Sequence, residues 1–173
     1  MTAAKADRWI AVAPGSEAAL ALALAHVMVK ENAYDTEFVN NYAFGFEDWT
    51  DSRGKARKGF KSYLLAECSP EQLAGVTGLE ASSIRELARD FMIHKNAVVV
   101  WGSGTAHSPN NIYHDLAFMA LNLLKGNLKA EGLMTFQPAV PLASLPEPQL
   151  DAHAQAGLQK MRLDLAEAGR APM

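Results

Sequence analysis

Hydrophobic residues recur along the chain at spacings that predict mostly helices. The segment 17–29 is apolar on nearly all sides, which is typical of a helix that is buried all round. Ser16 is a good N-cap for this helix, and Glu17 in its first turn suits the positive helix end. Two later helices are apolar on one face only. Their predicted buried stripes are Ile84, Leu87, Ala88 and Phe91 in one, and Ile112, Leu116, Met119, Ala120 and Leu123 in the other.

Polar residues mark where several of these helices begin and end. Asp35 is expected to cap a short helix. Ser69 begins another helix, because Pro70 suits the first helical position and Gln72 completes a capping box. Glycine ends helices readily, since it adopts the left-handed conformation without strain. The predicted helix stops are Gly45, Gly78 and Gly126.

Two apolar segments, 9–12 and 97–101, are predicted to be strands. The second is a continuous run rich in β-branched residues, which suits a strand covered on both faces of a parallel sheet. Such a strand needs strand neighbours, and this chain offers few. We therefore predict a helix-rich α/β fold. It would be a partial Rossmann-like three-layer fold with about six helices and two short parallel-type strands, lacking much of its sheet. This inventory indicates a fragment, or a subunit that another chain completes.

Composition and charge exclude several classes of function. The 173 residues have a net charge of −3, without sign of the basic face that nucleic-acid binders carry. The N-terminus lacks the apolar core of a signal peptide, and no apolar stretch is long enough to span a membrane. We therefore predict no nucleic-acid partner and no direct membrane insertion. The basic segment 51–59 is interpreted as an exposed loop or loose helix. An anionic partner remains the alternative for that segment.

The loop Gly102-Ser103-Gly104 follows the second predicted strand and precedes a helix, which is the geometry that cradles phosphate. The dinucleotide fingerprint requires a third glycine where this chain has His107. From the local sequence, a phosphate site and a tight turn without ligand are about equally supported. His107 is either a ligand contact or an exposed loop residue.

No catalytic or metal-ligating group emerges from spacing alone. His107 and His114, with the adjacent Asp115, are too few ligands for a metal site unless others converge there. Cys68 has no visible partner for nucleophilic catalysis and is interpreted as structural. His26 lies within the predicted buried helix and is interpreted as a hydrogen-bonded core histidine.

Several segments, taken in order, resemble the catalytic subunits of molybdopterin oxidoreductases of the dimethyl-sulfoxide-reductase type. The resemblance covers about residues 4 to 135 and depends on order and spacing together. The segments that carry it are 4–10, Pro14-Gly15-Ser16-Glu17-Ala18-Ala19-Leu20, 34–39 with Tyr42, 45–47, 69–71, Thr77-Gly78, 84–89, Val99-Val100-Trp101-Gly102-Ser103-Gly104 and Ala120-Leu121-Asn122-Leu123-Leu124-Lys125-Gly126-Asn127.

The resemblance implies that residues 1–135 are part of a domain that binds molybdopterin guanine dinucleotide with molybdenum or tungsten. Residues 136–173 would be a Pro-rich extended linker with a weak C-terminal helix. The turn Gly15-Ser16-Glu17 would contact the guanine end, with the carboxylate accepting from guanine N–H groups. Gly102, Ser103, Gly104 and His107 would approach the pterin and pyrophosphate.

The chain departs from this family in ways that bear on its role. Glu17 stands where aspartate is usual, and His107 stands where glutamine is frequent. Family members are several hundred residues longer, and we expect the iron–sulfur segment and the metal-ligating residue to lie outside the stretch that this sequence covers. The chain alone is therefore expected to hold no cofactor or metal and to be inactive, whereas its parent would be an oxidoreductase.

The expected partners are the remainder of the catalytic subunit, together with iron–sulfur and membrane-anchor subunits. The periplasmic face of a membrane or the cytoplasm are both compatible locations. One alternative is a cofactor-free molybdopterin-like scaffold subunit of a respiratory membrane complex. A second is an independent nucleotide-binding module, which the missing third glycine disfavours.

Overall fold

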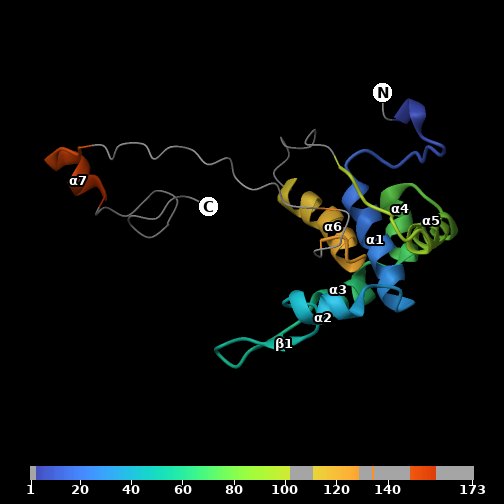
Figure 1. The fold of residues 1–173 in the computed structure, drawn as a ribbon, viewed down its shortest axis with the longest axis horizontal. Helices are drawn as coiled ribbons and strands as arrows, with labels where there is room; N and C mark the ends of the chain where they lie inside the picture. Colours follow the sequence, from blue (N-terminus) through green and yellow to red (C-terminus); the bar gives the residue numbers. More distant parts are fainter. Residues whose placement is uncertain (1–2, 102–110, 129–133, 135–148, 159–173) are drawn as a thin grey trace. The chain divides into compact units, whose positions relative to one another are not determined.

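The computed structural model describes residues 3–101, 111–128, 134 and 149–158. Helix α1 (Glu17–Lys30) runs through the centre of the first unit and packs against four other helices (Figure 1). These are α3 (Phe60–Glu67), α4 (Pro70–Thr77), α5 (Ala81–Ile93) and α6 (Asn111–Leu124). The short helix α2 (Thr36–Tyr42) packs on α6, and a single 3₁₀ turn, η1 (Ala3–Lys5), lies near the N-terminus.

The core surrounds α1, as the sequence predicts for a helix that is apolar on all sides. Its buried residues come from every face of the helix. They pack with Leu64 of α3, Ile84 of α5 and Leu121 of α6, each of which has at most 2% of its surface exposed. The stripe predicted for α5 is confirmed, because Ile84 and Ala88 are fully buried and Leu87 and Phe91 pack against the core.

The predicted capping of the short helices is confirmed. The Asp35 carboxylate accepts a hydrogen bond from the Phe38 N–H at 2.9 Å, which caps α2. Ser69 and Gln72 form both halves of a capping box at the start of α4, and Pro70 occupies the first turn. Gly78 ends α4 in the left-handed conformation. These features depend only on neighbouring residues, which is why the sequence predicts them.

The two predicted parallel-type strands are wrong for the part of the chain that the structure describes. Residues 9–12 and 97–101 form no sheet. A strand needs a neighbour for its backbone N–H and C=O groups. The described residues supply no strand beside 97–101, and a side chain of α6 bonds to its backbone instead. The segment is nevertheless extended in character, with side chains alternately half-buried and exposed.

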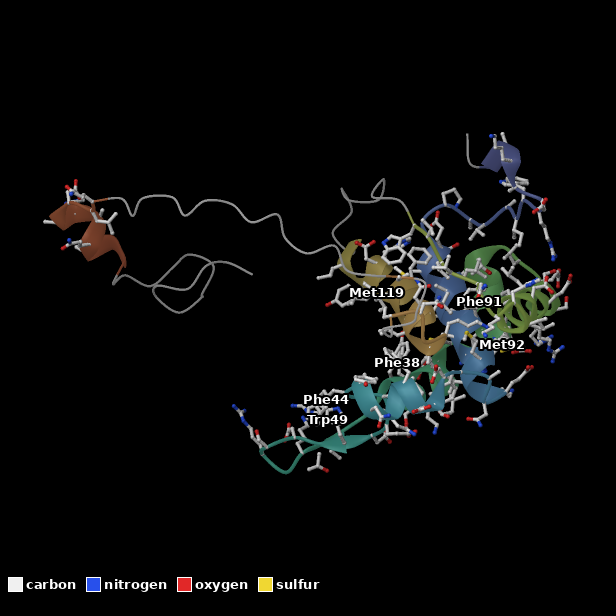
Figure 2. The ribbon with its side chains drawn as sticks, viewed as in Figure 1. Phe38, Phe44, Trp49, Phe91, Met92 and Met119 are labelled. Atoms are coloured by element: carbon white, nitrogen blue, oxygen red, sulfur yellow. The ribbon has the colours of Figure 1, made fainter. Side chains whose placement is uncertain are left out.

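The described sheet is an antiparallel hairpin of β1 (Trp49–Thr50) and β2 (Ala56–Arg57). Its turn and β2 lie in the basic segment 51–59, which was expected to be an exposed loop or loose helix, and both strands are exposed. Asp51 holds the turn, because one carboxylate oxygen accepts from the backbone N–H groups of Arg53 and Lys55, both at 2.9 Å. Phe44 and Trp49 lie edge to face at the base of the hairpin, with ring centroids 4.9 Å apart (Figure 2).

The buried face of α6 differs from the prediction. Ile112 and Leu116 are 65% and 56% exposed, and the predicted members Met119, Ala120 and Leu123 are only half-buried. The face that meets α1 carries Ala117, Leu121 and Leu124. Compared with the predicted orientation, α6 is rotated about its own axis. In the observed orientation Asn122, which is fully buried, faces the segment 97–101. Hydrophobicity alone did not predict a buried polar position.

The chain divides into two compact units, Met1–Phe136 and Gln137–Met173. In the second unit the structure describes α7 (Ala152–Leu158), which falls within the stretch expected to form a weak helix. None of the described helices is both long and apolar enough to cross a membrane.

Candidate functional site

A cavity of about 410 Å³ lies between the N-terminal half of α1, α6 and the extended segment 97–101. This volume is within the range of small-molecule sites, about 300–1,000 Å³. Most of the wall is apolar and two titratable side chains face it. The lining residues are Glu17, Leu20, Ala21, Leu24, Val99, Val100, Trp101, His114, Phe118 and Leu121.

Glu17 and His114 meet at this cavity. The Glu17 Oε2 atom lies 3.4 Å from His114 Nε2, so the two form an ion pair when the imidazole is protonated. Glu17 Oε2 is buried and accepts no hydrogen bond from any residue that the structure describes. The Nδ1 atom of His114 is likewise buried and without a described hydrogen-bond partner. A buried polar atom normally has a partner, so both atoms are suited to a ligand.

Aromatic rings form another part of the wall, beside His114. Trp101 stacks on Phe118 with ring centroids 5.8 Å apart and an angle of 23° between the planes. His114 meets the same Phe118 edge to face, at 5.2 Å and 74°. The rings therefore support one another, and the site offers flat apolar surface beside a carboxylate and an imidazole.

The turn before α1 brings Glu17 to the cavity. Gly15 has a φ of +83°, a conformation that favours glycine, and it is exposed. Ser16 occupies the N-cap position of α1, but the prediction that it caps the helix is wrong. Its hydroxyl instead donates to the carbonyl of Ala13 at 2.7 Å. Ser16 thus closes the turn, and the backbone N–H groups of the first helical turn are left without a side-chain cap.

The loop residues Gly102, Ser103, Gly104 and His107 lie outside the described residues, so their predicted contacts stay predictions. The structure describes the chain up to Trp101, which lines the same cavity as Glu17. Of the predicted site residues, Glu17 faces the cavity directly, while Gly15 and Ser16 shape the turn before it.

The structural roles predicted for His26 and Cys68 are confirmed. His26 is 4% exposed and its Nδ1 atom lies 2.8 Å from the carbonyl oxygen of Leu64. Cys68 is a free, buried thiol, and burial raises its pKa, so the start of α4 does not activate it. Within the described ranges, no three His, Cys, Asp or Glu side chains gather as a metal site would require.

Sequence reasoning missed three residues of this site. His114 was considered only as a metal ligand and Trp101 only as part of a strand and of the family resemblance, and Phe118 was not singled out. Their common signal is spacing. His114 and Phe118 are four apart, so they share one face of a helix. A ring pair beside a histidine on that face could have indicated the cavity wall.

Comparison with known proteins finds several relatives of this chain. The chain is 34% identical over 137 residues to the dimethyl sulfoxide reductase DmsA of Haemophilus influenzae, which covers 75% of this chain and 17% of that protein. It is 32% identical over 154 residues to formate dehydrogenase H of Escherichia coli, covering 84% of this chain and 20% of the relative. The chain thus spans about a fifth or less of these proteins.

Structural comparison points the same way. The solved structure of acetylene hydratase from Pelobacter acetylenicus matches 75% of this chain and 16% of its own, with a TM-score of 0.59 and 27% identity. The sequence model of the molybdopterin oxidoreductase family matches residues 1–166. Since this match spans nearly the whole sequence, the chain belongs to the molybdopterin oxidoreductase family.

Proposed function

We propose that the cavity beside Glu17 receives the guanine end of a molybdopterin guanine dinucleotide. Family membership makes this chain part of the cofactor-binding region of a molybdopterin oxidoreductase catalytic subunit. The observation that carries the finer proposal is the Glu17 carboxylate. One of its oxygens is buried beside an open cavity and accepts no hydrogen bond from the described residues.

The donor set of guanine fits this carboxylate. Guanine presents N1–H and N2–H groups side by side, and a carboxylate accepts two such bonds with its two oxygens. Adenine cannot match this pattern, because its N1 atom is an acceptor. The stacked Trp101 and Phe118 rings add flat apolar surface, on which a purine base stacks with a gain of about 1–3 kcal/mol.

His114 is proposed to contact the sugar or a phosphate. Its Nε2 atom faces the Glu17 carboxylate, so a proton on Nε2 leaves the Nδ1 lone pair free to accept from a hydroxyl. When doubly protonated, the ring presents Nδ1–H to an anion instead. The backbone N–H groups in the uncapped first turn of α1 would favour negative charge nearby.

Gly102, Ser103, Gly104 and His107 are proposed to approach the pyrophosphate and pterin. Trp101 lines the cavity, so the loop begins at its edge. A cavity of this size would take one base or a part of the dinucleotide, and the rest of the cofactor would contact other regions of the catalytic subunit. When bound, the metal and pterin supply the electron-transfer chemistry, while this chain binds and orients.

The finer identity of the complete protein is also proposed. It would carry molybdenum or tungsten on two pterin dinucleotides, with the metal ligand outside this chain. Iron–sulfur and membrane-anchor subunits would be its partners. A cofactor-free scaffold is the competing possibility. The cavity disfavours it, because Glu17 Oε2 is buried and accepts no hydrogen bond from the described residues, an arrangement that costs stability and would bring a scaffold no gain.

The test is isothermal titration calorimetry of the full 173-residue chain, with guanosine monophosphate in one experiment and adenosine monophosphate in another. A single nucleotide is expected to bind weakly, with a Kd of about 1 mM. Guanosine monophosphate should bind about tenfold more tightly than adenosine monophosphate, since a bidentate pair of hydrogen bonds to the base contributes about 1–3 kcal/mol of discrimination. Glu17→Gln should remove most of this preference.

Glu37→Gln is the matched control, because Glu37 occupies the first turn of α2 and is exposed. This variant should keep the preference for guanine. Equal affinity of the wild-type chain for the two nucleotides would sink the guanine assignment. Molybdenum and tungsten analysis of the complete protein separates enzyme from scaffold, and a well-folded protein without either metal would support the scaffold.

A further inference from the structure

The segment that leads into the Gly102 loop has a fixed register without a strand beside it in the described structure. Ala97, Val99 and Trp101 are half-buried against the helices, whereas Val98 and Val100 are 40% and 84% exposed. This alternation is that of a strand with one face on a core. Some contact must fix which residues point inward, because a slip of one residue would exchange the two faces.

Asn122 of α6 supplies that contact. Its side chain is fully buried, and its amide pairs with both backbone groups of Val99. The Val99 N–H donates to Asn122 Oδ1 at 3.0 Å, and Asn122 Nδ2 donates to the Val99 carbonyl at 2.9 Å. The side-chain amide thus does what a residue of a neighbouring strand would do.

The amide of Asn122 uses its full hydrogen-bonding capacity. Oδ1 also accepts from Asn127 Nδ2 at 3.0 Å, and Nδ2 also donates to the carbonyl of Phe118 at 3.4 Å. Two donors and two lone pairs are all that an asparagine side chain offers. Asn127 Nδ2 makes a second bond, to the carbonyl of Ala97 at 2.9 Å. The two asparagines together form hydrogen bonds with the backbone of alternate residues, Ala97 and Val99.

The end of α6 holds the second asparagine in place. Gly126 has a φ of +72°, and its N–H donates to the carbonyl of Leu123 at 2.9 Å. The N–H of Asn127 donates to the carbonyl of Asn122, also at 2.9 Å. This pair of bonds is the Schellman motif, which ends a helix at a left-handed residue. It brings the side chains of residues 122 and 127 together.

We infer that Asn122, assisted by Asn127, is a positioning residue that sets the register of 97–101 and thereby places Trp101 in the cavity wall. Trp101 is two residues beyond Val99, and its ring stacks on Phe118, one turn before Asn122 on the same helix. The same pairing fixes the point from which the Gly102 loop departs. The link to ligand binding rests on the proposed function, whereas the link to Trp101 does not.

The experiment uses the full chain with Trp9→Phe and Trp49→Phe, so that Trp101 is the single fluorescent reporter. Asn122→Leu removes the amide and leaves both backbone groups of Val99 unpaired. We expect red-shifted Trp101 emission and stronger quenching by iodide, with the helical circular dichroism signal retained. Guanosine monophosphate affinity should fall about tenfold, as expected when a buried hydrogen-bonded contact is lost.

Ile84→Ala is the matched control, since Ile84 is fully buried on α5 and does not line the cavity. It should destabilise the chain while leaving Trp101 emission and quenching as they are in the folded state. If Asn122→Leu fails to fold, Asn127→Ala is measured instead, and a smaller shift in the same direction is expected.

Unchanged Trp101 emission and quenching in a folded Asn122 or Asn127 variant would overturn the inference. An equal change in Ile84→Ala would overturn it too, because the effect would then follow stability alone. Absence of nucleotide binding in the parent chain contradicts the proposed function only. The fluorescence result still decides the role of Asn122 in that case.

Discussion

Replacing Gly126 by alanine tests the helix end that connects the core to the candidate site. Gly126 has a φ of +72°, a region that residues with a Cβ atom rarely adopt. A Cβ atom here would also overlap with the Oδ2 atom of Asp35. The Asp35 carboxylate caps α2, and the Asp35 N–H donates to the carbonyl of Leu124 at 2.8 Å. One methyl group therefore disturbs two helix ends.

The expected loss of stability follows from these two effects. A left-handed alanine costs about 1–2 kcal/mol. Displacing the capping carboxylate costs about 1 kcal/mol more. The total of about 2–3 kcal/mol corresponds to a fall in Tm of about 5–10 °C for a protein of this size.

Thermal unfolding followed by circular dichroism measures this loss, with Gly75→Ala as the control. Gly75 lies inside α4, is exposed, and has no atom within 4 Å of the position of an added Cβ. Alanine should stabilise the chain there by about 0.5–1 kcal/mol, because it favours a helix interior over glycine. The two substitutions should therefore shift Tm in opposite directions. A Gly126→Ala variant as stable as the parent would refute the reasoning about this helix end.

Two further predictions concern titratable groups. The backbone N–H of Lys55 holds the pKa of Asp51 below its usual value of 3.8, helped by Arg53 and Arg57, so this carboxylate stabilises the hairpin above the unfolded-state pKa. Its contribution is lost as pH falls through the lower folded-state pKa, so hydrogen exchange at Trp49–Thr50 should become faster in acid as the hairpin loosens. The variant Asp51→Asn should show this faster exchange already at pH 7. If the variant and the parent chain were equally protected from exchange at pH 7, the result would count against the turn described here. Burial raises the pKa of the Cys68 thiol, so iodoacetamide should label it at neutral pH far more slowly than a free cysteine, with full labelling in denaturant; rapid labelling of the native chain would contradict this burial.

The sequence predicted those parts of the fold that depend on neighbouring residues. The capping box at Ser69 and the cap at Asp35 need only a side chain and the backbone two or three residues away. The left-handed stops at Gly78 and Gly126 depend on the conformational freedom of one residue. The central helix was predictable because a segment without a polar face must be buried all round.

Features that depend on distant partners could not be predicted. The apolar run 97–101 has the composition of a strand, but a strand exists only where another strand accepts its hydrogen bonds. The inward face of α6 contains Asn122, which is buried because it bonds to Val99, 23 residues away. A hydrophobic pattern assigns such a residue to the solvent side, which shifted the predicted stripe.

The candidate site was predictable in part for the same reason. Glu17 could be selected because the turn Pro14-Gly15-Ser16-Glu17 carries part of the resemblance to the family, and this turn is a local feature of the sequence. His114, Trp101 and Phe118 reach the cavity through tertiary packing between α1, α6 and the extended segment. The roles of His114 and Phe118 depend on which face of α6 points inward, and that is the feature that the sequence pattern misassigned.

The most direct test of the central claim is a crystal structure of this chain with guanosine monophosphate bound. We predict the base in the cavity beside Trp101, with its N1 and N2 atoms about 2.7–2.9 Å from the Glu17 carboxylate oxygens. A nucleotide bound elsewhere, or bound in this cavity with Glu17 turned away from the base, would contradict the proposal that Glu17 recognises guanine.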